Sequence, residues 1–255
     1  MKVLYLAWQD RQNRKWLPVG KLSYDGAIYR FVYTKGAKKS PNFMPFGRMV
    51  DLNSTYKSEE LFPLFSNRII SKKRPEYTHI LKWLDLREDE TDPLILLAKT
   101  EGIRETDTLT VFSCPEPDDE GKYRANFFSH GLSHLSDTTI NRVKSLRPGE
   151  RLYLMPDPQN QYDLLAIALR TDDPKTIVGY CPRYISADFL KLLKEDPGAV
   201  IVQVKKLNVE APVQWRLLCS LVARWPRNFS PCSDEVYEEL PNGGTSQPVT
   251  CGHSD

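Results

Sequence analysis

Residues 157–167 read DPQNQYDLLAI, and sixteen positions after Asp163 the chain continues with GYCPR at residues 179–183. The polar segment lies between two runs typical of β-strands, residues 151–154 and 166–169. A turn rich in Asp, Asn and Pro, with one aromatic ring, offers donors, acceptors and a flat surface from a fixed scaffold. Such a turn suits binding of a small end-group better than covalent chemistry. One alternative is a plain hairpin loop whose Asn and Asp side chains bind only their own backbone.

Three further blocks accompany this loop in order and at suitable spacing. They are HGLSH at residues 130–134, Leu-x-Pro-Gly-Glu-x-Leu-x-Leu at 146–154 and Ile-Val-Gly-Tyr-x-Pro-Arg at 177–183. With them, the stretch from Phe127 to Leu193 resembles a HIRAN domain, the module attached to replication-fork remodelling helicases and also found in bacterial proteins. The resemblance implies a small barrel related to the OB-fold that captures the 3′ end of single-stranded DNA.

The same resemblance implies site residues in the loop. Tyr162 would stack its ring on the terminal base, an interaction worth roughly 1–3 kcal/mol per base. Asp163 would accept a hydrogen bond from the terminal sugar hydroxyl, and Asn160 would shape the loop. Taken together, these three residues predict a socket for a strand end that does not read base sequence.

Three more positions complete the DNA-binding set that the resemblance implies. His134 and Tyr180 would lie near the nucleotide, although each taken alone is equally typical of core or rim packing. Arg183 would neutralise a backbone phosphate, which makes binding weaken with salt. Ser133 departs from the family, which often has Arg there, so a charge-assisted contact is lost unless a nearby cation replaces it. The candidates for that replacement are Arg142, Lys144 and Arg147.

Residues 1–118 have a β-rich first half and a helical second half. Alternation of aromatic residues over 28–33 favours a strand, and Asp92 before Pro93 is typical of a helix N-cap followed by Pro at the first helical position. The sequence predicts strands at 2–8, 28–33 and 109–112, and helices at 58–69, 75–84 and 93–101.

This half resembles the first N-terminal subdomain of the HipA family of Ser/Thr kinases. The matching segments are Val-Gly-x-Leu at 19–22, Tyr-x-Phe-x-Tyr at 29–33, LFPLFSNRI at 61–69 and DPLILL at 92–97, followed by Gly102 and the closing strand. In some bacteria this subdomain is a separate small protein that pairs with, and restrains, a kinase lacking it. The sequence holds no glycine-rich phosphate loop with a paired Lys and no kinase catalytic loop.

These observations define the expected organisation. We predict an α+β, mainly β protein of two small domains: a HipA-N-like domain at 1–112 and an OB-like HIRAN β-barrel with flanking helices at 126–225. The polar segment 113–125, with two Pro and one Gly, is expected to be a linker. Residues 226–255 lack periodicity and are expected to form a disordered tail.

Composition limits the partners. Residues 126–225 carry 13 Lys and Arg against 10 Asp and Glu, too small an excess for a protein that coats long duplex DNA. The longest apolar runs are too short for a membrane span, and five scattered Cys without a C-x-x-C pair indicate neither a disulfide framework nor a zinc site. We expect no membrane association, no metal, no cofactor and a cytoplasmic location, with nucleoid association as an option.

Two functions of different classes follow. The first is a non-catalytic DNA-binding protein whose HIRAN-like domain captures single-stranded 3′ ends. The second is an antitoxin-like partner of a HipA-type kinase, which would use residues 1–112 as the interaction domain. An enzyme ranks third, because no arrangement of acid, base and nucleophile is recognisable.

Overall fold

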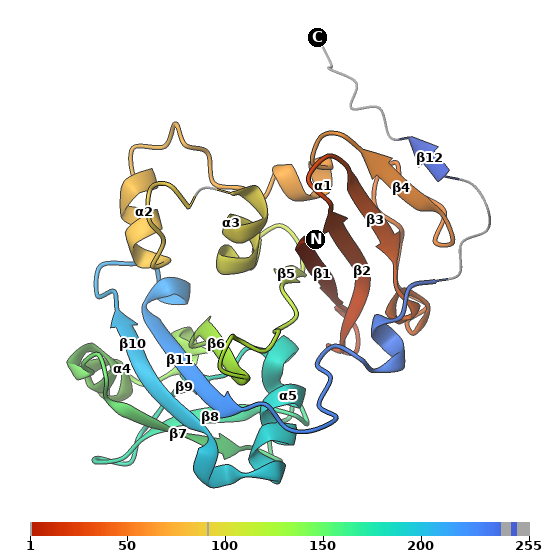
Figure 1. Ribbon diagram of the computed structural model, residues 1–255. Helices are drawn as coiled ribbons and strands as arrows, with labels where there is room; N and C mark the ends of the chain where they lie inside the picture. The colour runs from red at the N-terminus through yellow and green to blue at the C-terminus, as the bar shows by residue number, and fades with distance from the viewer. Residues whose placement is uncertain (1, 91, 241–245, 249–255) are drawn as a thin grey trace. The chain divides into compact units, whose positions relative to one another are not determined.

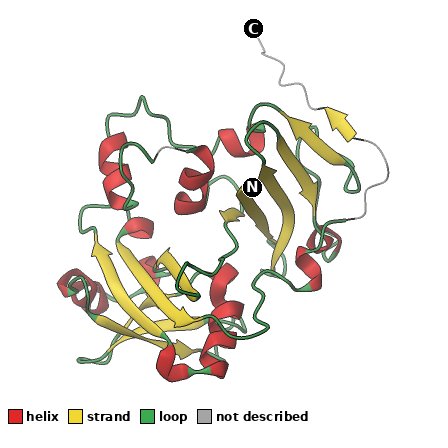
Figure 2. Cartoon of the chain, in the orientation of Figure 1, coloured by secondary structure: helices red, strands yellow, loops and turns green. Residues whose placement is uncertain are grey.

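The structure is a computed structural model that describes residues 2–90, 92–240 and 246–248. The chain divides into two compact units (Figures 1 and 2): unit 1 is formed by residues 1–114 and 232–255, and unit 2 by residues 115–231. Each unit is built on one six-stranded sheet with few helices, one of the sheets being a curled half-barrel. This confirms the expected mainly β, α+β fold.

Unit 1 has the sheet order β12-β4-β3-β2-β1-β5. Its central strands are antiparallel, with Leu4 opposite Leu22 and Leu22 opposite Phe31. The elements of unit 1 are β1 Lys2–Gln9, β2 Trp16–Tyr24, β3 Tyr29–Tyr33, η1 Lys35–Lys38, β4 Thr55–Ser58, α1 Pro63–Ser66, α2 Tyr77–Trp83, α3 Pro93–Thr100, β5 Leu109–Phe112, η5 Glu235–Tyr237 and β12 Ser246–Pro248.

The aromatic residues of β3 organise the core of unit 1. Phe31 and Tyr33 are fully buried, with ring centroids 5.0 Å apart. The Tyr33 hydroxyl donates to Met49 O (2.7 Å) and accepts from Phe46 N (2.7 Å). Because a buried hydroxyl is costly without partners, this pair of bonds fixes the loop that contains Phe46 and Met49 against the sheet.

The helices of unit 1 confirm the sequence prediction in two cases and correct it in one. Asp92 caps α3, its carboxylate accepting from Leu94 N (2.8 Å) and Ile95 N (3.3 Å), and α2 lies within the predicted 75–84. The helix predicted at 58–69 is wrong in its extent. Ser58 is the last residue of β4, which pairs with β3, and within 58–69 only α1 is an α-helix.

The prediction that residues 226–255 form a disordered tail is wrong for the part up to residue 240 and for β12, which pairs with β4. Leu240 N donates to Tyr33 O (2.9 Å), and the Leu240 side chain joins the unit 1 core. Glu239 pairs with Arg30 (2.7 Å) and Lys21 (3.0 Å). The segment therefore returns to the sheet through backbone pairing and ion pairs, which leave no periodic pattern in the sequence. Residues 241–245 and 249–255 lie outside the described residues.

Unit 2 is a sheet of order β6-β11-β10-β7-β8-β9, with all described neighbours antiparallel. Helix α5 contributes Phe189, fully buried, which meets Phe127 of β6 at a ring-centroid distance of 5.4 Å. The elements of unit 2 are β6 Lys122–Phe128, η2 Leu132–His134, α4 Asp137–Ser145, β7 Arg151–Pro156, β8 Ile167–Thr171, β9 Ile177–Tyr180, α5 Arg183–Glu195, η3 Pro197–Ala199, β10 Ile201–Leu207, η4 Val213–Trp215 and β11 Leu217–Arg224.

Two boundaries in unit 2 differ from the sequence prediction. The expected linker 113–125 is wrong at its end, because β6 begins at Lys122 and pairs with β11, and Tyr123 is fully buried. From the sequence, Ser186 would be expected to cap the helix that follows it, but α5 begins at Arg183, and Ser186 lies inside the helix and donates to Pro182 O (3.2 Å). The earlier start of α5 is important for the site, because it puts Arg183 in the first turn.

Candidate nucleic-acid interface

The loop between β7 and β8 is held by Asn160. Its Oδ1 accepts from Tyr162 N (3.0 Å) and Asp163 N (3.1 Å), and its own N–H donates to Asp157 O (3.1 Å). Asp163 Oδ1 accepts from Leu165 N (3.0 Å). These are the backbone-satisfying bonds of a well-capped loop. They also fix the directions in which the loop presents its remaining side chains.

Tyr162 is one of those presented side chains, with 58% of its surface exposed. Leu164 (83%) and Leu165 (47%) follow it on the same loop. Exposed apolar groups clustered on a short, hydrogen-bonded loop are unusual on a surface without a partner. The side chain of Tyr162 therefore lies largely at the surface rather than packed into the barrel.

Asp163 and Arg183 form an ion pair at the base of the loop. Asp163 Oδ2 lies 3.5 Å from Arg183 Nε, and the two side chains are 19% and 28% exposed. Arg183 is the first residue of α5, where the helix dipole adds partial positive charge. The result is a partly exposed carboxylate and guanidinium, with the carboxylate on the residue that follows Tyr162.

Tyr180 supports the loop from β9. Its hydroxyl donates to Asp157 Oδ2 (3.1 Å), and Asn160 Nδ2 donates to the same oxygen (3.3 Å). Burial, followed by the hydrogen bond and charge of Asp157, raises the pKa of the Tyr180 phenol above its ordinary value. Tyr180 therefore remains a neutral donor at physiological pH and fixes the loop through Asp157.

The segment 130–134 is attached to the same strand. His130 and Tyr180 exchange both backbone hydrogen bonds at 2.9 Å. Gly179 makes this approach possible: its φ is +118°, and a Cβ there would lie 1.9 Å from Ser129 Oγ. His134 ends the short η2 turn, with its N–H donating to Gly131 O (3.0 Å) and its side chain exposed.

The structure thus links five of the six expected site residues through one network of contacts: Asn160, Tyr162, Asp163, Tyr180 and Arg183. His134 is connected to them through the backbone of residues 130–131. Of the cations considered as substitutes for an Arg at position 133, Arg142 is ion-paired with Glu150, whereas Lys144 and Arg147 are exposed.

Sequence reasoning missed two features of this surface. Asp157, the acceptor for Tyr180 and Asn160, was part of the quoted motif but had no assigned role. Tyr153 on β7 has the guanidinium carbons of Arg170 and Arg151 at 5.0 Å and 5.7 Å from its ring centroid. Alternation along β7 puts residues 151, 153 and 155 on one face. The sequence alone could therefore have shown that Arg151 and Tyr153 are neighbours.

Comparison with known families agrees with this geometry. The sequence model of the HIRAN domain family matches residues 122–225 of this chain. Residues 122–225 form a HIRAN domain. The match begins four residues before the expected boundary, at the first residue of β6. The HIRAN domain is a DNA-binding domain, which supports nucleic-acid binding by this part of the chain.

Solved structures similar to this chain include two with comparable coverage. The crystal structure of the HIRAN domain of human HLTF is 16% identical, with a TM-score of 0.31, over 40% of this chain and 74% of that one. A crystal structure of a protein from Lactobacillus plantarum is 19% identical, with a TM-score of 0.32, over 40% of this chain and 99% of that one. No curated protein matches the chain.

Metal binding, membrane insertion and thiol chemistry would each need a particular feature among the described residues. Within residues 2–90, 92–240 and 246–248, no three His, Cys, Asp or Glu side chains are grouped to hold a metal ion. In the same ranges, no helix has the length and apolar character needed to cross a membrane. Burial raises the pKa of the Cys181 thiol well above its ordinary value, so this thiol is not a poised nucleophile.

Proposed function

We propose that the HIRAN domain captures the 3′ end of single-stranded DNA without catalysing a reaction. The observation that carries this proposal is the exposed Tyr162 ring on a loop fixed by Asn160, next to the partly exposed Asp163–Arg183 pair. A stacked ring holds a base without reading its identity. A carboxylate accepts from a sugar hydroxyl and repels a phosphate at the same position. The site therefore favours a strand that ends in a free 3′-hydroxyl.

The outward face of β7 extends the same surface. Tyr153 is 36% exposed and Met155 37%, and the guanidinium groups of Arg151 and Arg170 flank the Tyr153 ring. An aromatic ring between two cations is typical of surfaces that follow a single strand, since rings stack on bases and guanidinium groups bind phosphates. We expect the nucleotides next to the terminal one to contact this face.

The test is fluorescence anisotropy with matched oligonucleotides that end in a 3′-hydroxyl or a 3′-phosphate. The full chain should bind the 3′-hydroxyl strand more tightly. Tyr162→Ala should remove most of the binding, whereas the control Tyr162→Phe, which keeps the ring, should retain it. Equal affinity for the two strands, or an unchanged Tyr162→Ala protein, would refute the proposal.

A second function concerns unit 1, which we propose to be a HipA-N-like interaction domain that restrains a HipA-type kinase. Support comes from the sequence resemblance and from exposed apolar side chains on the loop after η1, Met44 (78%) and Val50 (69%). Such groups are more typical of a protein contact than of a solvated loop. The two functions are compatible, since one chain can couple them in the cytoplasm.

The kinase proposal is tested by expressing the chain beside a HipA-type kinase encoded next to it. We expect co-purification and relief of the kinase's toxicity, both lost in a Met44→Glu/Val50→Glu variant. The matched control is Leu164→Glu, which changes an equally exposed apolar residue in the HIRAN domain. No interaction with any neighbouring kinase, or equal loss in both variants, would contradict a docking role for unit 1.

A further inference from the structure

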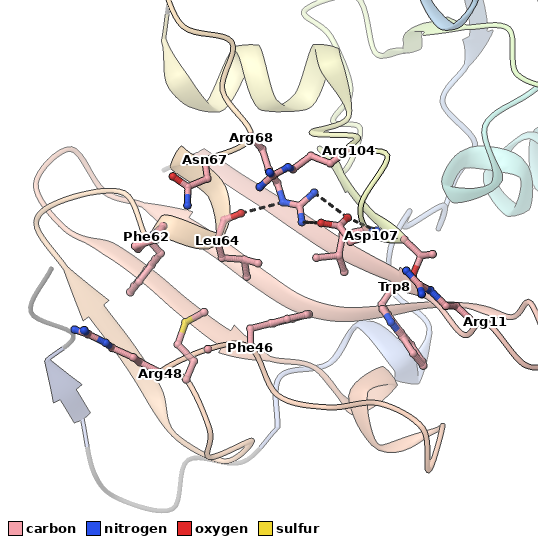
Figure 3. A pocket seen from close by; sticks show the side chains of 15 residues that line it. Trp8, Arg11, Phe46, Arg48, Phe62, Leu64, Asn67, Arg68, Arg104 and Asp107 are labelled. Atoms are coloured by element: carbon pink, nitrogen blue, oxygen red, sulfur yellow. Dashed lines mark hydrogen bonds and ion pairs between the residues drawn. The ribbon is translucent and has the colours of Figure 1, made fainter. Parts of the chain in front are cut away.

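Unit 1 contains a cavity of about 730 Å³ that neither proposed function uses (Figure 3). Its walls come from the end of β1 (Trp8), the loop that Tyr33 fixes (residues 46–49), the start of α1 (residues 62–64) and the turn before β5 (residues 104–108). All of these belong to the same compact unit. A concave site of this volume is typical of small-molecule binding.

The apolar part of the cavity is rigid. Trp8 packs edge-on against Phe43 with ring centroids 5.3 Å apart, and Phe46 stacks on Tyr33 at 5.9 Å. Met49 and Phe62, both buried, belong to the core cluster behind them. Because these rings and side chains are held by the core, the apolar wall is preformed, and a flat ligand would find it without ordering a loop.

The charged part of the cavity is strongly positive. Four arginines line it, Arg11, Arg48, Arg68 and Arg104, against one carboxylate, Asp107. Arg68 is buried and uses that carboxylate, with Nη2 2.5 Å from Asp107 Oδ2. The guanidinium group of Arg68 also donates to Gly102 O (2.8 Å) and Leu64 O (2.9 Å).

Besides the Arg68–Asp107 pair, three exposed arginines line the cavity. Figure 3 shows Arg104 on the edge that carries Arg68, Arg11 at the end near Trp8, and Arg48 at the opposite end. Guanidinium groups bind phosphate oxygens in a bidentate geometry. The two arginines that do not lie at the end opposite Trp8, Arg104 and Arg11, match a group with several negative charges.

We propose that this cavity binds a nucleotide, with the base against the Trp8 and Phe46 rings and the phosphate groups held by Arg104 and Arg11. Flat aromatic bases stack on such rings, and duplex DNA is too wide to enter a cavity of this size. A free nucleoside diphosphate and the 5′-phosphorylated end of a strand share this chemistry. The site is independent of the HIRAN loop and does not depend on 3′-end capture.

Isothermal titration calorimetry of the full chain with ADP, adenosine and inorganic phosphate tests the proposal. ADP should bind at least about tenfold more tightly than either fragment, because only ADP uses both the rings and the cations. Equal affinity for ADP and adenosine, or no saturable ADP binding at millimolar concentration, overturns the proposal without any variant. A short 5′-phosphorylated oligothymidine that displaces ADP identifies a strand end as the source, and failure to displace ADP identifies a free nucleotide.

Single substitutions test whether ADP binds in this cavity. Arg104→Ala should weaken ADP binding about tenfold, and Arg104→Lys should recover part of the loss because the charge remains. The matched control Arg74→Ala removes an exposed arginine outside the cavity and should change nothing. Tyr162→Ala should keep full ADP affinity. Loss of ADP binding in Tyr162→Ala, or equal affinity in Arg104→Ala and the wild type, would refute the assignment to this cavity.

Discussion

The Arg68–Asp107 pair of unit 1 and the Arg183–Asp163 pair of the HIRAN domain contain the same groups in different surroundings. In unit 1 the arginine side chain is 3% exposed and the closest N–O distance is 2.5 Å. In the HIRAN domain the arginine is 28% exposed and the distance is 3.5 Å. The guanidinium group of the first pair is therefore enclosed by protein, although Asp107 itself is 31% exposed, whereas water reaches the guanidinium group of the second pair.

Both aspartates also cap a local turn. Asp107 Oδ1 accepts from Leu109 N (3.1 Å), and Asp163 Oδ1 accepts from Leu165 N (3.0 Å). The local geometry is therefore alike, and the difference lies in burial. A buried charge needs its partner for stability, while a loose, partly hydrated pair can exchange its partner for a ligand. The comparison separates a structural ion pair from one suited to binding.

The largest expected effect is on stability, in matched Asp→Asn variants that keep the turn bond and remove the charge. Asp107→Asn should lower the free energy of unfolding by about 3 kcal/mol, because it leaves a buried guanidinium unpaired. Asp163→Asn should change it by less than about 1 kcal/mol. Chemical denaturation of both proteins measures the difference. Equal losses would remove the distinction between the two pairs.

The next largest effect is expected for Gly179→Ala, which tests whether the Arg183–Asp163 pair depends on the packing around it. The new Cβ would meet Ser129 Oγ at 1.9 Å, in a backbone conformation that side chains rarely adopt. We expect a destabilisation of about 2–3 kcal/mol and loss of DNA binding, because residues 130–134 separate from β9. Calorimetric unfolding and anisotropy provide the two readouts, and a fully stable variant would show that the close approach is dispensable.

Arg183→Gln should weaken DNA binding by about 1.5 kcal/mol. It should also make the slope of log K against log salt shallower by roughly 0.7, because one phosphate contact on a single strand is lost. The control Arg227→Gln removes an exposed arginine of unit 2 outside the proposed interface and should leave the slope unchanged. An unchanged slope in Arg183→Gln would mean that Arg183 stays with Asp163 when DNA binds.

The smallest effect concerns Glu239, which is 32% exposed and pairs with the partly exposed Arg30 (29%) and Lys21 (23%). The hydrogen bond from Arg30, against the opposing effect of burial, lowers the pKa of Glu239 below its ordinary value. The stability this gives is present above the pKa of the unfolded chain and disappears as pH falls through the lower folded value. Glu239→Gln should cost about 1 kcal/mol at pH 7 and flatten the acid limb of the unfolding profile.

The local features of this fold could be predicted from the sequence. The Asp92 cap predicted α3, and the alternation in residues 28–33 predicted β3. The ordered motifs of residues 130–183 predicted the HIRAN domain. In each case the signal lies within a few residues, because caps, turns and strand alternation are local interactions.

Long-range contacts were not predictable. Arg68 and Asp107 are 39 residues apart, and Glu239 meets Arg30 across 209. Nothing in the neighbourhood of either residue marks its partner. Strand β6 was hidden because residues 122–125 continue the polar composition of the preceding segment, although Tyr123 is buried in the barrel. The arginine-lined cavity likewise forms only when four separate segments meet.

The return of Leu240 to the backbone of Tyr33 has a consequence for biosynthesis. As the ribosome extends the chain, all of unit 2 emerges before residues 232–240 can complete the first sheet. The HIRAN domain can therefore finish folding while unit 1 still lacks its last segment. Truncation after residue 114 would leave the N-terminal half without its last core residue, so a stable excised version should join residue 114 to residue 232 through a short spacer.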